Sequence, residues 1–204
     1  MSTRAVRVVA LGGVIGPVGF VFAWLATGAA AAHYSPVSDA ISDLARTHAR
    51  TRGAMTLGFV VFGAGVIAFG LALRAAGSGP AWMSAVATAC FTLAVAATPL
   101  GAPTRDVVHG TFASLGYLTL VAVPALSARP LARAGRPGAC RASLVTAAVA
   151  ACCLLASAAG PAHGLFQRAG LTVGDLWIVV VALYLVGGRD LFAHGSVTAG
   201  PERT

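Results

Sequence analysis

Residues 54–73 read AMTLGFVVFGAGVIAFGLAL, a stretch that contains no charged side chain. A helix needs about 20 predominantly apolar residues to cross the hydrocarbon core of a bilayer, which is about 30 Å thick. This stretch therefore predicts a transmembrane helix, and it sets the class of the whole protein.

The rest of the chain has the same character, because 57% of its 204 residues are hydrophobic and only 10% are charged. Six segments approach or meet the length of a membrane span, and the last is extended back to Pro161 because proline suits the first turn of a helix. A membrane β-barrel is excluded, since the sequence lacks its alternating polar pattern. The fold class is all-α, an integral membrane bundle in one domain, 1–204, with predicted spans 6–32, 54–73, 82–100, 107–126, 142–159 and 161–186.

Arginine outnumbers the acidic residues, 14 basic side chains against 6 acidic ones. If both termini are cytoplasmic, the larger share of the arginines falls on the cytoplasmic side, as the positive-inside rule requires. The charge thus indicates topology in a bacterial-type cell membrane and contact with membrane lipids, and no nucleic-acid partner is expected. The cytoplasmic set is Arg4, Arg7, Arg74, Arg129, Arg133, Arg136, Arg141, Arg189 and Arg203, and the external set is Arg46, Arg50, Arg52, Arg105 and Arg168.

The first 32 residues also resemble a secretory signal peptide, with two arginines, an apolar stretch and a run of alanines. Their apolar stretch is longer than that of a usual signal peptide, which favours a retained first helix. Gly12-x-x-x-Gly16 and Gly170-x-x-x-Gly174 have a spacing that allows close packing of membrane helices. We expect both pairs of glycines to lie against neighbouring helices.

Most residues capable of chemistry fall in three short stretches, residues 33–46, 104–109 and 163–168. Each follows an odd-numbered span, so all three should lie on the same, external side of the membrane. Their convergence predicts one polar His/Asp/Arg pocket at that surface.

The first stretch predicts a helix from Pro36 to about Thr47, capped by Ser35, that lies along the membrane surface or folds over the bundle. At 100° per residue its polar side chains fall on one stripe that could face a site. The alternative is purely structural, with Asp43 paired to Arg46 across one turn and the carboxylates favouring the helix N-terminus. The stripe consists of Ser35, Asp39, Ser42, Asp43 and Arg46.

In the second stretch, Asp106 and His109 are three residues apart, so that Asp106 either orients the His109 ring or simply caps its own helix. In the third, His163 and Gln167 share a helix face and Arg168 lies beside them. Asp175 lies two turns deeper than Arg168. A carboxylate at that depth requires a partner, for which Arg168 and Arg105 are the candidates.

The chain also resembles a bacterial membrane family known as domain of unknown function 998. The resemblance rests on YSPVSDAISDLA at residues 34–45, a histidine in the fourth span and GLFQR at residues 164–168. It implies a six-helix membrane protein whose activity is not established. A looser resemblance to membrane hydrolases related to alkaline ceramidases carries no residues over, since the chain lacks a His-x-x-x-His pair in its last span.

Three functions remain open. The favoured one is a pocket that binds a lipid headgroup or small ligand, or docks a partner; its residues are Tyr34, Ser35, Ser38, Ser42, Asp43, Arg46, Arg105, Gln167, Arg168 and Asp175. The second is a zinc-dependent hydrolase with metal ligands His33, His109 and His163 and catalytic residues Asp39, Asp106 and His109. The third is a small-molecule transporter, which is disfavoured because Asp175 alone reaches toward the membrane midplane.

Overall fold

The computed structural model describes residues 1–193, and Arg203 of the cytoplasmic set lies outside them. The described residues form helices joined by short connections. In chain order these are α1 (Thr3–Ala10), α2 (Gly12–Ala30), the 3₁₀-helix η1 (Ile41–Ala45), α3 (Arg52–Ala75), α4 (Ala81–Ala97), α5 (Pro103–Arg133), α6 (Pro137–Ser157) and α7 (His163–Val186).

The lengths of these helices confirm a six-helix membrane bundle. Five of the helical segments are long and apolar enough to span a membrane, with α1 and α2 together forming the first, and α4 is a shorter apolar helix. The helix α5 is longer than the predicted span, since it runs on to Arg133 and leaves three residues before α6. Helix α7 begins at His163, so Pro161 lies in the preceding turn and does not open the helix.

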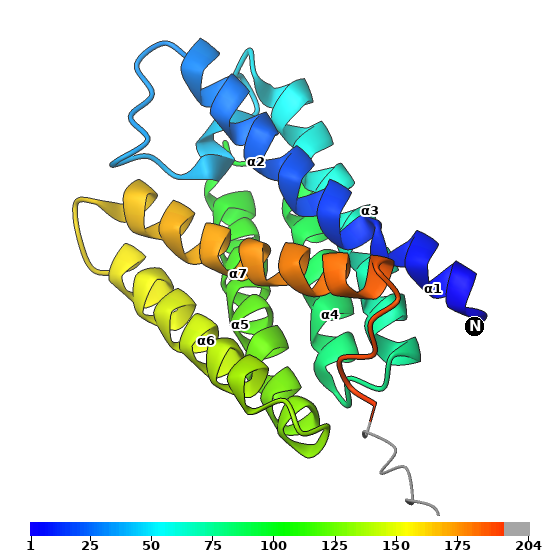
Figure 1. Ribbon diagram of the computed structural model, residues 1–204. Coiled ribbons are helices and arrows are strands. Elements are labelled where there is room, and N and C mark those ends of the chain that lie inside the picture. The colour runs from blue at the N-terminus through cyan, green and yellow to red at the C-terminus, as the bar shows by residue number, and fades with distance from the viewer. Residues whose placement is uncertain (194–204) are drawn as a thin grey trace, which may run out of the picture.

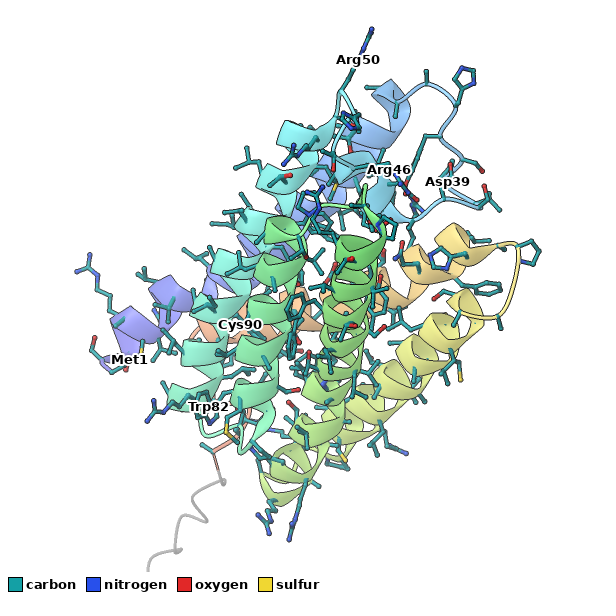
Figure 2. The ribbon with its side chains drawn as sticks, turned by 180° about the vertical axis from the view of Figure 1, so that it is seen from behind. Met1, Asp39, Arg46, Arg50, Trp82 and Cys90 are labelled. Carbon is teal, nitrogen blue, oxygen red and sulfur yellow. The ribbon has the colours of Figure 1, made fainter. Side chains whose placement is uncertain are left out.

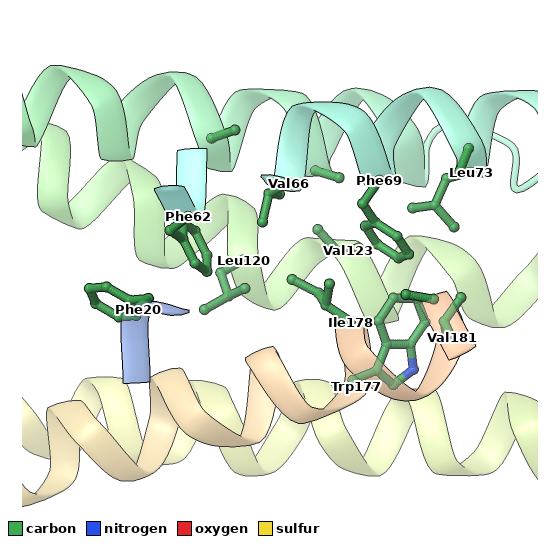
Figure 3. Packing of buried hydrophobic residues seen from close by; sticks show 14 of the residues in the cluster. Phe20, Phe62, Val66, Phe69, Leu73, Leu120, Val123, Trp177, Ile178 and Val181 are labelled. Carbon is green, nitrogen blue, oxygen red and sulfur yellow. The ribbon is translucent and has the colours of Figure 1, made fainter. Parts of the chain in front are cut away.

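Consecutive helices pack side by side, and α7 returns to α2 to close the bundle. Figure 1 shows α7 crossing in front of α5, with α2 above it and α6 below it. The core lies where these helices meet. Figure 3 shows Phe62 and Phe69 of α3 facing Leu120 of α5 and Ile178 of α7 across it.

The predicted close packing at glycine is confirmed. A side chain at Gly12 would collide with the backbone of Gly65 in α3, and one at Gly16 would crowd the Phe62 carbonyl. Gly170 and Gly174 also lie against neighbouring helices, at Leu154 of α6 and Leu120 of α5 respectively. Lipid tails are as apolar as these side chains, so helix association in a membrane depends on such close approach.

The three polar stretches share one end of the bundle, as predicted. Thr47 donates from its backbone N–H and its hydroxyl to the Leu100 carbonyl, at 2.9 and 2.6 Å, which joins the first stretch to the α4–α5 connection. The N–H of Leu165 donates to the Val37 carbonyl at 3.0 Å, which joins it to the start of α7. In Figure 2, Asp39, Arg46 and Arg50 lie at this end, away from Met1 and Trp82.

The helix of the first stretch is shorter than the predicted Pro36–Thr47 α-helix, since only η1 forms there. The reason is competition for backbone carbonyls. The carbonyls of Pro36, Val37 and Asp39, which a longer helix would use itself, accept hydrogen bonds from donors of α7. Asp39 and Asp43 therefore do not project from one helix face.

Candidate functional site

Arg168 fastens residues 34–47, hereafter the cap segment, onto the bundle. Its Nη1 donates to the carbonyls of Pro36, Asp39 and Gly164 at 2.8, 3.0 and 2.8 Å, and its Nη2 donates to the hydroxyl of Tyr34. The guanidinium also lies 5.4 Å from the ring centroid of Tyr34 and from that of Trp24 in α2. These contacts use the positive charge of Arg168 to hold the cap segment.

Gln167, on the preceding position of α7, makes a second connection. Its Oε1 accepts a hydrogen bond of 2.9 Å from the N–H of Ile41, and its Nε2 donates to the hydroxyl of Tyr117 in α5. A backbone N–H can only donate, so this contact fixes which end of the amide is oxygen. Gln167 thereby ties η1 to both α7 and α5.

A chamber lies inside the bundle beneath η1. The space open to the centres of water molecules measures about 60 Å³. One water needs about 10–15 Å³ on this measure, so the chamber suits a molecule of a few non-hydrogen atoms. It is lined by Phe20, Ile41, Ser42, Phe59, Phe62, Thr88, Thr92, Val95, His109, Phe112, Ala113, Gly116, Tyr117, Leu120, Gln167, Leu171 and Asp175.

His109 is one of the residues that line this chamber. Its Nδ1 lies 2.7 Å from the carbonyl oxygen of Thr98. Because a carbonyl only accepts, this contact assigns the proton of the neutral ring to Nδ1 and leaves Nε2 as an acceptor. The ring is 4% exposed, and Nε2 has no hydrogen-bond partner among the described residues.

Asp106 has no part in orienting His109. Its Oδ1 accepts hydrogen bonds from the backbone N–H groups of Gly101 and Ala102, at 2.7 and 3.3 Å. This is a capping contact at the start of α5, the second of the two interpretations of Asp106. The Thr98 carbonyl at the end of α4 orients the imidazole instead.

Asp175 is the second unpartnered group of the chamber. It is 3% exposed, and within residues 1–193 neither of its carboxyl oxygens has a hydrogen-bond partner. The predicted pairing with Arg168 or Arg105 does not form, because Arg168 faces the cap segment and Arg105 is exposed at the start of α5. An uncompensated carboxyl at this depth is costly and is a common mark of a functional site in membrane proteins.

The acidic residues of the cap segment have local partners. Asp43 pairs with Arg46 at 2.7 Å, and its other oxygen accepts the N–H of Ala40 at 3.1 Å, which caps η1. The hydrogen bond to Asp43 raises the pKa of Arg46. Asp39 accepts from the N–H of Ser35 at 2.8 Å and from the hydroxyl of Ser38 at 3.0 Å, so of the predicted polar stripe only Ser42 lines the chamber.

The three histidines proposed as zinc ligands lie in different surroundings. His33 is exposed in the connection after α2, with a φ of 60°. The Nδ1 of His163 lies 2.5 Å from the Ser157 carbonyl, while His109 faces the chamber. Within residues 1–193 no three metal-binding side chains form a group. A zinc site therefore stays a prediction, which elemental mass spectrometry of the purified protein would test.

Sequence reasoning missed Thr88, Thr92 and Tyr117, which also line the chamber. Two spacings in the sequence indicate that these side chains face the protein interior. Thr88 and Thr92 are four residues apart on one face of α4, and Tyr117 lies eight residues beyond His109 on one face of α5. Polar side chains repeating at that spacing in an apolar helix indicate a face turned toward the protein interior.

Comparison with known proteins places the chain in a family without supplying an activity. No curated protein and no solved structure matches it. The family model described as "Protein of unknown function (DUF998)" matches residues 14–184, a range that includes the cap segment and every residue lining the chamber. The chain therefore belongs to the membrane family of unknown function DUF998.

Proposed function

We propose that this protein binds a small ligand in the chamber beneath η1. The observation that carries the proposal is the unpartnered pair His109 and Asp175. Both are buried, both line the same chamber, and both leave polar atoms without a partner among the described residues. A mostly apolar cavity with a few convergent polar groups is the usual form of a small-molecule site.

The proposal differs from an anionic-headgroup pocket at the membrane surface. The three arginines that would make such a pocket do not converge, since Arg168 holds the cap segment, Arg46 pairs with Asp43 and Arg105 is exposed. The two groups without partners, His109 and Asp175, lie deeper, within the membrane-spanning helices. Flux into reconstituted vesicles would measure whether a ligand bound there also crosses the membrane.

We also propose that the end bearing the cap segment is external and that both termini are cytoplasmic. The asymmetric distribution of arginine supports this orientation. A ligand would then reach the chamber from the external side, past Ile41 and Ser42 of η1.

The proposal is tested by a binding screen on the native chain in lipid nanodiscs. Saturation-transfer NMR would be recorded with alcohols, amides, carboxylates and amines of up to about five non-hydrogen atoms, the size that the chamber permits. Support requires saturable binding of at least one compound that is lost in Ala113→Leu, which fills the chamber, and kept in Ala125→Leu, which faces outward from the same helix. If no compound binds, the proposal is overturned.

A further inference from the structure

The hydrogen-bonding groups that line the chamber indicate the class of its ligand. Of the groups that line it, Thr88 and Thr92 donate their hydroxyl hydrogens elsewhere. The Thr92 hydroxyl lies 2.9 Å from the Thr88 carbonyl, and that of Thr88 lies 2.9 Å from the Ser84 carbonyl and 3.0 Å from the Thr119 hydroxyl. Both threonine oxygens are therefore left to accept.

His109 and Asp175, two ionisable groups of the chamber, can also accept hydrogen bonds. The Nε2 of His109 is an acceptor, because the Thr98 carbonyl takes the ring proton. The carboxylate form of Asp175 accepts only. The Gln167 amide uses its oxygen and one of its two N–H groups, and the Tyr117 hydroxyl, which accepts from it, keeps one hydrogen to donate. Asp175 alone brings two unpartnered oxygens to the chamber, which suits a ligand that bears N–H groups.

The charges of the lining residues also favour a cationic ligand. Among the described residues that line the chamber, Asp175 is the one acidic side chain, and no arginine lines it. Asp175 lies halfway along the 24-residue helix α7, where water is scarce. A carboxyl at such a depth either holds a proton or faces a cation, and an anionic ligand would be repelled by its charged form.

The remaining wall is aromatic. Phe20 lies between Phe59 and Phe62, at ring-centroid separations of 5.5 and 5.2 Å, and Phe112 and Tyr117 complete the aromatic lining. The face of an aromatic ring attracts a cation within about 6 Å, most strongly where water is excluded. An ammonium group could therefore meet Asp175 on one side and ring faces on another.

We infer that the ligand of the chamber is a small primary ammonium cation whose nitrogen lies against Asp175. The inference rests on the chamber being a ligand site, as proposed above, and adds the chemical class of its occupant. The limited volume restricts the organic part to a few carbon atoms.

Three probes of similar size and different charge test this on the native chain alone. Methylammonium, methanol and acetate would be titrated into nanodiscs by saturation-transfer NMR at matched ionic strength. We expect saturable binding of methylammonium and at least tenfold weaker binding of the other two. Equal or stronger binding of methanol or acetate would overturn the ammonium inference yet leave the ligand site standing, whereas the binding of none of the screened compounds would overturn both.

Two Asp→Asn substitutions test whether the charge of Asp175 binds the ligand. Asp175→Asn keeps the size of the side chain and removes its charge, and we expect it to weaken methylammonium binding at least tenfold. Asp190→Asn makes the same change at an exposed position after α7, outside the chamber, and should leave the affinity unchanged. Unaltered affinity in Asp175→Asn, with thermal unfolding like that of the native chain, would contradict the assignment.

Discussion

At the scale of single residues, the buried carboxyl of Asp175 lowers the free energy of unfolding. Its carboxyl is buried in the middle of α7, and no partner for it is found within residues 1–193. A buried polar group without a partner costs about 1–3 kcal/mol. Residues that serve binding commonly carry such a cost, because a site must keep groups free for its ligand.

We therefore expect Asp175→Leu to stabilise the protein by about 1–3 kcal/mol in the absence of added ligand, since it removes the unpaired carboxyl. The exposed Asp190, changed to Leu, provides the control and should shift stability by less than about 0.5 kcal/mol. Both are measured by thermal unfolding in one detergent. A loss of stability in Asp175→Leu would mean that the carboxyl has a structural partner.

At the scale of elements, the cap segment depends on a glycine at the first turn of α7. A Cβ atom at Gly164 would run into the Asp39 carbonyl oxygen and would lie 2.8 Å from that of Pro36. These are the two carbonyls of the cap segment that Arg168 holds. The absence of a side chain at Gly164 therefore allows the cap segment to approach α7 closely enough for these hydrogen bonds.

Gly164→Ala should accordingly destabilise the protein by about 1–3 kcal/mol, because overpacking against backbone atoms forces the cap segment away. Gly160→Ala is a matched control, since nothing lies within 4 Å of the Cβ that it would add. Thermal unfolding and hydrogen exchange at Ile41, whose N–H bonds to Gln167, would report the change. Faster exchange at Ile41 in Gly164→Ala alone is the expected result.

These same elements show what sequence could and could not predict. Each predicted span overlaps a helical segment, because twenty apolar residues in a row have few alternatives, although α5 runs seven residues past the predicted end of its span. The length of the cap helix was wrong, since the donors that take its carbonyls come from residues 165 and 168, far along the chain. The pairing expected for Asp175 failed for a related reason, because Arg168 finds its acceptors in the cap segment.

At the scale of the whole molecule, the proposed orientation in the membrane rests on the distribution of charge. Gly53 and Gly138 lie in the first turns of α3 and α6, at opposite ends of the bundle, and both have free space around them. In a chain whose natural cysteines are replaced by serine, we expect Gly53→Cys to react with a membrane-impermeant maleimide in intact cells. Gly138→Cys should react only after the cells are opened. The reverse pattern would place the cap segment in the cytoplasm.

The unequal lengths of adjacent helices also affect the bilayer. Helix α4 has 17 residues and its neighbour α5 has 31, so they are about 26 and 46 Å long at 1.5 Å per residue. The shorter helix falls below the hydrocarbon thickness of about 30 Å, and the longer one exceeds it. Hydrophobic mismatch then acts on α4, so the surrounding lipid must thin beside it. Helix α5 carries charged residues near both ends, and these turns project beyond the hydrocarbon: Arg105, Asp106, Arg129 and Arg133. The acyl-chain length of the lipid therefore affects how α4 and α5, which form two walls of the chamber, are positioned relative to each other.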